Sequence, residues 1–140
     1  MAGYSGTPLP QKLGIKPGHQ VLLANAPAGF KATLAKLPAK ATVQKPGDSE
    51  GPFDVILLFA KNVGELHWEF APLKEKLVTN GGLWVAWPKK ASGVETDLTE
   101  DIIREVGLKA GLVDNKVCAI DEVWSGLRFV IRVKDRPKRG

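Results

Sequence analysis

The segment 87–93 carries the residue types best suited to binding an anion. It reads Trp-Pro-Lys-Lys-Ala-Ser-Gly and follows an apolar run typical of a buried strand. The ammonium groups of Lys89 and Lys90 attract anions, and Ser92 and free backbone amides can add hydrogen-bond donors. The alternative interpretation is that the two lysines form a solvated turn that holds no ligand.

Two other loops are expected at the same edge of the fold. Asn25 and Gly29 lie in the loop after the first apolar strand, and Lys61 follows the strand 53–60. Ligands of open α/β sheets bind beyond the carboxyl ends of the strands, near the point where strand order reverses. We therefore predict a crevice that binds a phosphate- or carboxylate-bearing small molecule, with Lys31 as a further cation. The predicted ligand-binding residues are Asn25, Gly29, Lys61, Trp87, Lys89, Lys90 and Ser92.

The first of these loops departs from the usual pattern of a nucleotide site. A dinucleotide-binding loop reads G-x-G-x-x-G, but here only Gly29 is present. An acidic residue that would hold a ribose is also absent from the end of the second strand, where Gln44 and Lys45 stand. Both absences count against tight binding of a dinucleotide or of S-adenosylmethionine.

Other chemistry-bearing residues have simpler explanations. His19 and His67 are 48 positions apart and have no partner at metal-ligand spacing, so no metal site is predicted. Cys118 lies in an apolar strand, which favours an inert core thiol over a nucleophile. No Ser-His-Asp arrangement and no pair of catalytic carboxylates stands out, so the catalytic residues and the cofactor stay unknown.

Length and composition are those of one ordinary globular domain. The chain has 140 residues, of which 44% are hydrophobic and 25% charged, and we expect a single domain over 1–140 with an irregular arm at 1–10 and a basic tail at 134–140. The longest apolar run is 55–60, too short for a membrane span, and the start has no secretory signal. We therefore expect a cytoplasmic protein that does not associate with membranes. The sequence does not indicate its oligomeric state.

The net charge of +5 is distributed unevenly. Residues 1–46 hold six lysines and no acid, whereas residues 47–127 hold eight basic and fourteen acidic side chains. Residues 128–140 hold six basic side chains against Asp135 alone. One interpretation is a solvated tail, and the other is an electrostatic contact with nucleic acid or another polyanion.

Hydrophobic patterning predicts alternating strands and helices. Asn80-Gly81-Gly82 predicts a helix stop with a glycine in the left-handed cap, and Asp97 to Glu100 resembles a capping box. Trp84 and Trp87 are expected on the same side of their strand, packed under a helix. The predicted strands are 21–24, 41–44, 53–60, 83–87, 113–120 and 124–133, and the predicted helical stretches are 30–37, 66–77 and 98–106.

This order of elements predicts a three-layer α/β fold of Rossmann type. The last two strands are joined by a connection too short for a crossover helix, so they must be antiparallel, while the others form a mostly parallel sheet. A mostly parallel sheet that ends in an antiparallel hairpin resembles a truncated class I methyltransferase. Because a fold does not determine an activity, this architecture by itself assigns none.

Several motifs together resemble a known family. The motifs are Ser5-Gly6-Thr7-Pro8-Leu9, Lys12-Leu13-Gly14-Ile15-Lys16, Gly81-Gly82-Leu83-Trp84-Val85-Ala86-Trp87-Pro88-Lys89-Lys90, Thr96-Asp97-Leu98-Thr99-Glu100-Asp101, Val117-Cys118-Ala119 and Trp124-Ser125-Gly126-Leu127-Arg128. They are similar to a family of small bacterial proteins of unknown function (domain-of-unknown-function family 3052). The resemblance covers the chain apart from its basic end and implies a small cytoplasmic domain, but it transfers no catalytic residue.

Three functions are therefore compatible with the sequence. The first is a protein of unassigned catalysis that binds an anionic small molecule or a partner at the Lys89–Lys90 edge. The second is a divergent relative of the S-adenosylmethionine-dependent methyltransferases. The third is a nucleic-acid accessory protein that acts through its basic termini.

Overall fold

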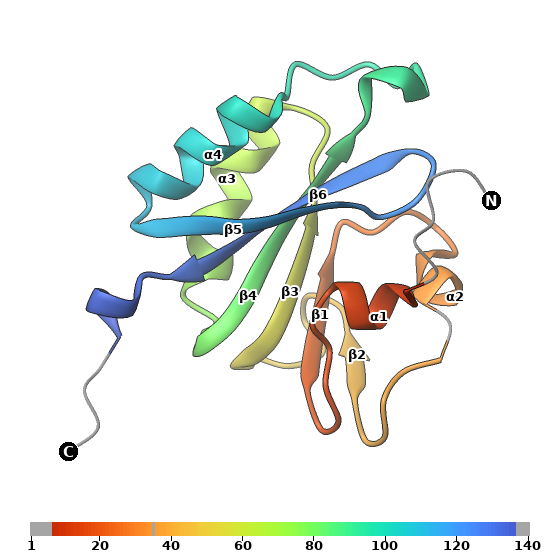
Figure 1. Cartoon of the computed structure of the whole chain (residues 1–140), viewed down its shortest axis with the longest axis vertical. Helices are drawn as coiled ribbons and strands as arrows, with labels where there is room; N and C mark the ends of the chain where they lie inside the picture. Colours follow the sequence, from red (N-terminus) through yellow and green to blue (C-terminus); the bar gives the residue numbers. More distant parts are fainter. Residues whose placement is uncertain (1–6, 35, 137–140) are drawn as a thin grey trace.

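A sheet of six strands forms the centre of the molecule. The computed structural model describes residues 7–34 and 36–136. Its strands lie side by side in the order β2-β1-β3-β4-β6-β5 (Figure 1). The strands are β1 (Gln20–Ala24), β2 (Thr42–Gln44), β3 (Phe53–Phe59), β4 (Leu77–Pro88), β5 (Leu112–Ala119) and β6 (Trp124–Ile131).

The strand directions confirm the predicted topology. β1 pairs in parallel with β2 and β3, and β3 pairs in parallel with β4. β6 is antiparallel to both of its neighbours, β4 and β5. Because β1 has its next strands in the chain on opposite sides, the strand order reverses beside it. This is where open α/β sheets place their ligands.

Helices cover both faces of the sheet, which makes three layers (Figure 1). α3 (Val63–Lys74) and α4 (Glu100–Lys109) pack on one face, and α1 (Leu9–Lys12) and α2 (Phe30–Leu34) pack on the other. β3 lies between these layers, and its apolar side chains are buried on both sides. That double burial explains why the segment 53–60 is apolar almost without alternation.

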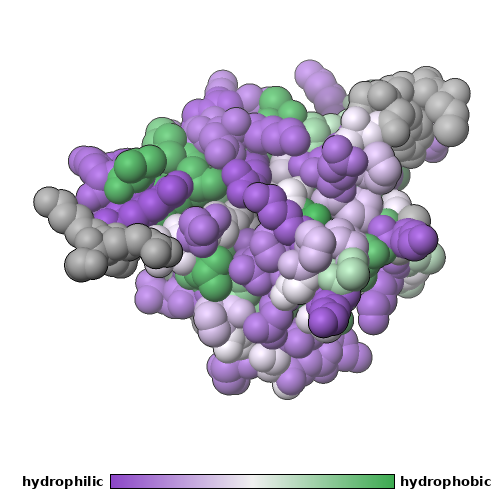
Figure 2. All heavy atoms as spheres, turned by 60° about the horizontal axis from the view of Figure 1, so that its bottom comes forward, coloured by the Kyte–Doolittle hydropathy of each residue, from purple (hydrophilic) through white to green (hydrophobic). Residues whose placement is uncertain are grey.

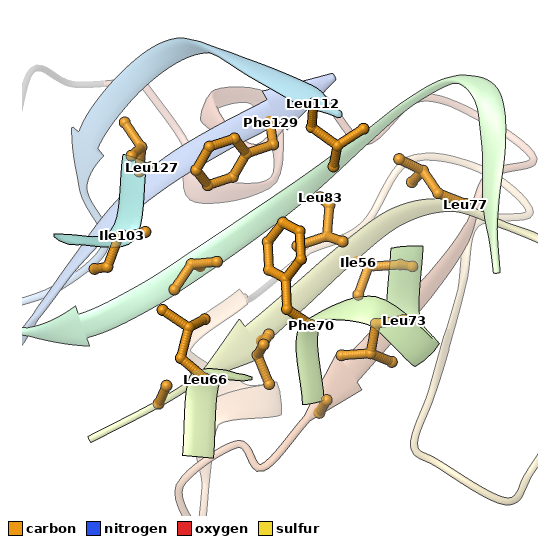
Figure 3. Packing of buried hydrophobic residues seen from close by; sticks show 14 of the residues in the cluster. Ile56, Leu66, Phe70, Leu73, Leu77, Leu83, Ile103, Leu112, Leu127 and Phe129 are labelled. Atoms are coloured by element: carbon orange, nitrogen blue, oxygen red, sulfur yellow. The ribbon is translucent and has the colours of Figure 1, made fainter. Parts of the chain in front are cut away.

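Large side chains from both helices and the sheet interlock under α3 and α4. Figure 3 shows Phe70 of α3 facing Phe129 of β6, with Leu66 and Ile103 beside them. The two phenyl rings meet edge to face, with centroids 5.6 Å apart. Interdigitated packing of this kind fixes how far α3 and α4 stand from the sheet.

Two local predictions in this part of the chain are wrong. Asn80, Gly81 and Gly82 do not end a helix, because α3 ends at Lys74 and these residues belong to β4. Trp84 and Trp87 do not share a side: Trp84 packs in the core beside α1 and α2, and Trp87 in the core beside α3 and α4. Side chains alternate along a strand, so residues three positions apart point to opposite faces.

The starts of the two long helices are held together. Asn62 is the N-cap of α3, and Thr99, rather than Asp97, is the N-cap of α4. The Asp97 carboxylate instead accepts a hydrogen bond from the backbone N–H of Val63, at 2.9 Å. The loop before α4 is therefore fastened to the carboxyl edge of the sheet, where α3 begins.

The surface is that of a chain whose apolar residues are mostly inside. On the side that lies at the bottom of Figure 1, hydrophilic residues dominate and hydrophobic ones occupy smaller areas (Figure 2). Within residues 7–34 and 36–136, no helix is long and apolar enough to cross a membrane.

Candidate functional site

Two cavities open at the carboxyl edge of the sheet, on either side of the loop that follows β1. The first has a volume of about 740 Å³ and lies between this loop and the end of β2. The second has a volume of about 440 Å³ and lies between the same loop and the end of β3. Residues 25–27 line both cavities and so form the wall between them.

The loop after β1 takes backbone conformations that few residue types tolerate. Asn25 has a φ of 60° and Gly29 a φ of 80°, both in the left-handed region. Glycine adopts this region freely, and asparagine is one of the few other residues that does. The Asn25 side chain donates a hydrogen bond to the Glu69 carboxylate of α3, at 3.0 Å, which fastens the loop to that helix.

Gln44 at the end of β2 carries an unusual polar atom beside the first cavity. It lines this cavity, and its Oε1 is buried with no hydrogen-bond partner among residues 7–34 and 36–136. An unsatisfied buried acceptor costs about 1–3 kcal/mol. Such a group is unusual in a folded protein and calls for an explanation, and a donor from a ligand is one. In the sequence, this position stands out only by its lack of an acid.

The second cavity combines charged and aromatic groups. It is lined by Lys61 and Glu65 together with Phe59 and Trp124. The rings of Phe59 and Trp124 meet edge to face, with centroids 5.0 Å apart, and give the cavity a rigid apolar wall. The Glu65 carboxylate accepts a hydrogen bond from the backbone N–H of Lys61, at 3.1 Å, so its position is fixed by the turn into α3.

The Lys89–Lys90 segment does not take part in either cavity. Asn25, Gly29 and Lys61 do line one or both of them, as does Lys31. The residues that line neither are Trp87, Lys89, Lys90 and Ser92.

The Lys89 backbone N–H and the Ser92 hydroxyl, two of the predicted donors, form hydrogen bonds within the protein. The Lys89 N–H donates to the carbonyl oxygen of Val123, at 2.7 Å, and the Ser92 hydroxyl donates to the carbonyl oxygen of Lys89, at 2.6 Å. Trp87 is buried in the core. The geometry therefore gives no support to an anion site that unites the lysine pair with the loop after β1.

The remaining titratable candidates form no reactive centre. His19 accepts a hydrogen bond from the Lys16 N–H, and in the described parts of the chain no three His, Cys, Asp or Glu side chains are grouped to hold a metal ion. Burial raises the pKa of the Cys118 thiol, and the nearby Lys12 and Lys116 offset this only in part. A raised pKa means less thiolate, so Cys118 is a poor nucleophile.

Comparison with known proteins identifies the fold. No family model and no curated protein matches the chain. A SAM-dependent methyltransferase from Aquifex aeolicus superposes with a TM-score of 0.61 at 14% identity, over 87% of each chain.

A ribosomal protein L11 methylase from Lactobacillus delbrueckii subsp. bulgaricus gives 0.61 at 16% identity, over 89% of this chain and 75% of that one. A 1,6-didemethyltoxoflavin-N1-methyltransferase from Burkholderia thailandensis, with 1,6-didemethyltoxoflavin and S-adenosylhomocysteine bound, gives 0.60 at 15% identity, over 86% and 73%. The fold is thus of the class I methyltransferase type, as predicted, and identities this low show the fold alone.

Proposed function

We propose that this chain is a divergent relative of the S-adenosylmethionine-dependent methyltransferases and that it binds this cofactor, or S-adenosylhomocysteine, in the first cavity. The observation that carries the proposal is the buried, unpartnered Oε1 of Gln44 on the cavity wall. The likeness of the fold to several methyltransferases supports it. When bound, the cofactor supplies a methyl group carried on a positively charged sulfur.

Gln44 is placed to hold a ribose. Nucleotide-binding α/β folds use an acid about 20 residues after the first strand to accept a hydrogen bond from a ribose hydroxyl. Gln44 is 20 positions beyond Ala24, the last residue of β1, and stands at the end of β2. Its amide oxygen accepts the same hydrogen bond without a negative charge. For a ribose hydroxyl to become the missing partner, the amide has to rotate so that the buried Oε1 faces the cavity.

The loop after β1 fits the close approach of a ligand to the backbone. No atom lies within 4 Å of the place where a Cβ of Gly29 would stand, so the chain is open there. Asn25 takes the left-handed conformation that a glycine of the usual loop would supply. The loop therefore has left-handed backbone at two positions, as a glycine loop would, although only one of the two residues is a glycine.

A methyl acceptor belongs in the second cavity under this proposal. That cavity adjoins the first across residues 25–27. Its aromatic wall at Trp124 suits a planar apolar group, and Lys61 and Glu65 supply a cation and a carboxylate. Acceptors with a ring and one polar substituent therefore fit its lining best.

Isothermal titration with S-adenosylmethionine and S-adenosylhomocysteine tests the proposal. Gln44→Leu leaves the ribose hydroxyl unpaired, and the loss of one such hydrogen bond is expected to weaken binding by about 10-fold to 100-fold. Gln44→Glu restores an acceptor. Its affinity is expected to be close to that of the wild type and above that of Gln44→Leu. Lys89→Ala/Lys90→Ala is the matched control, because neither lysine lines the cavity, and its binding is expected to be unchanged.

Other outcomes separate the alternatives. If the wild type binds neither compound, or if Gln44→Leu binds as well as the wild type, the proposal is wrong. If the double lysine variant alone loses a bound nucleotide or coenzyme, the anion site at the Lys89–Lys90 edge is favoured instead. Membership of domain-of-unknown-function family 3052 is a separate prediction that this experiment leaves open.

A further inference from the structure

Four cationic residues follow one another across the sheet face that carries α1. They are Lys12, Lys116, Arg128 and Arg136, here called the Arg128 patch, and none of them lines either cavity. The Lys116 ammonium donates a hydrogen bond to the carbonyl oxygen of Lys12, at 3.1 Å, and Lys116 lies opposite Arg128 in the pairing of β5 with β6. Arg136 completes the group from beyond the end of β6, where its Nε donates to the carbonyl oxygen of Ile131, at 3.0 Å.

Arg128 is seated on the sheet by a glycine of the neighbouring strand. A Cβ at Gly82 would lie 2.8 Å from both Cζ and Nη2 of Arg128, a distance that real Cβ atoms essentially never show. The guanidinium therefore lies directly over the backbone of β4 at Gly82, and Arg128 is half-buried. This gives a structural role to one of the glycines that the sequence analysis assigned to a helix stop.

Arg128 has no carboxylate partner in the described part of the chain. Its side-chain hydrogen bond goes to the amide oxygen of Asn115, at 3.4 Å. Arg104, by contrast, contacts three carboxylates, those of Glu100, Asp101 and Asp114. Burial lowers the pKa of Arg128, and the positive charge of Arg136 lowers it further. Both effects destabilise the charged form of Arg128, and an anion bound at the patch would stabilise it.

We propose that the Arg128 patch binds the phosphate backbone of a nucleic acid. Arginine presents a planar fork of N–H donors that matches two oxygens of one phosphate, and a cation that is held in place loses less freedom on binding. The patch is also extended, since residues 128–136 add Arg132 and Lys134 and hold Asp135 as their only acid. Several cations along a path suit a polyanion better than a single small anion. The patch is separate from the proposed cofactor cavity, so each can fail without the other.

Fluorescence anisotropy with a labelled single-stranded RNA tests this proposal in the full chain. The RNA has about 20 nucleotides, and binding is measured between about 50 mM and 200 mM salt. Arg128→Gln/Arg136→Gln is expected to weaken binding about 10-fold or more at the lower salt concentration. Because each phosphate contact on a single strand contributes about 0.7 to the slope of log K against log salt, the slope should become shallower by about 1.4. Arg136→Gln alone is expected to give about half of that change in slope.

The control removes the same two charges elsewhere. Lys89 and Lys90 follow Pro88, the last residue of β4, whereas Gly82 lies in the middle of that strand; Lys89→Gln/Lys90→Gln is therefore expected to keep the wild-type affinity and slope. Inorganic phosphate at a concentration that leaves the ionic strength unchanged should compete only weakly. Absence of RNA binding by the wild type, equal weakening in the control, or binding only to phosphatidylglycerol vesicles would each overturn the proposal. If circular dichroism shows that Arg128→Gln/Arg136→Gln is unfolded, the slope of log K against log salt for Arg136→Gln alone tests the proposal.

Discussion

Replacing Gly107 with alanine would show how closely α4 packs on the sheet. Gly107 is a buried residue of α4, and a Cβ there would lie 2.6 Å from Cζ of Phe129 and closer still to two other ring atoms. The Phe129 ring is fully buried and is held edge to face by Phe70, so it has no open space to move into. The added methyl group must therefore push α4 away from β6 or force the ring off its rotamer.

The expected cost is the difference between two opposing effects. Overpacking a well-filled core costs about 1–3 kcal/mol, and the very close approach to the Phe129 ring puts Gly107→Ala in the upper part of that range, at about 2–3 kcal/mol. Alanine is favoured over glycine inside a helix by about 1 kcal/mol, which offsets part of this cost. The net loss of unfolding free energy should be about 1–2 kcal/mol, and for a domain of this size this corresponds to a fall in Tm of about 3–8 °C. Thermal unfolding followed by circular dichroism, repeated in guanidinium chloride, measures it.

Gly64→Ala is the matched control for this substitution. Gly64 lies in the first turn of α3 on the exposed side, and the nearest atom to its Cβ position is the side-chain oxygen of Asn62, at 3.4 Å. The same change of residue there should raise the stability by about 0.5 kcal/mol, since only the helix preference acts. A rise in Tm for both variants would refute the packing of α4 against Phe129.

Two further predictions concern a helix start and a thiol. Thr99→Ala removes the oxygen that accepts a hydrogen bond from the Ile102 N–H at 3.2 Å, and it should lower the free energy of unfolding by about 1 kcal/mol; an unchanged denaturation midpoint would contradict Thr99 as the N-cap of α4. Cys118 has a raised pKa, so its thiolate fraction at any pH near neutrality lies below that of a free cysteine. Its reaction with Ellman's reagent should be slow at pH 7 and should accelerate at a higher pH than that of a free cysteine, which is half ionised at pH ~8.5; rapid reaction at neutral pH would contradict the burial.

The parts of the fold that the sequence predicts are those set by long apolar patterns. The segment 53–60 is apolar because β3 is covered on both faces, and a short continuous apolar run is typical of a central parallel strand. The prediction of a helix stop at Asn80-Gly81-Gly82 is wrong because glycine has two different structural uses. It supplies left-handed caps, but it also leaves space, and here Gly82 leaves space for Arg128. Only the neighbouring strand decides between these roles, and Arg128 of β6 lies 46 positions beyond Gly82 in the chain.

The candidate site, like the fold, can be predicted from the sequence only in part. Asn25, Gly29 and Lys61 lie near the cavities because they directly follow strands whose carboxyl ends share one edge. Lys89 and Lys90 also follow a strand, yet the short helical turn after them uses Ser92 and the local backbone for its own hydrogen bonds. Which donors remain available to a ligand depends on such contacts, and spacing in the sequence does not reveal them.

This chain differs from a nucleotide-binding sequence more in its residue types than in the backbone conformation and hydrogen-bond acceptors that those residues provide. The usual glycine loop needs left-handed backbone at its turns, and Asn25 and Gly29 both supply it. The usual acid after the second strand needs only to accept a hydrogen bond, and Gln44 offers an acceptor that has no partner in the described protein. Under the proposed function, a count of glycines and carboxylates therefore underestimates how well this edge would suit a ribose. It follows that Gln44→Glu should leave binding of S-adenosylhomocysteine close to that of the wild type, because the exchange changes the charge at this position and keeps the acceptor.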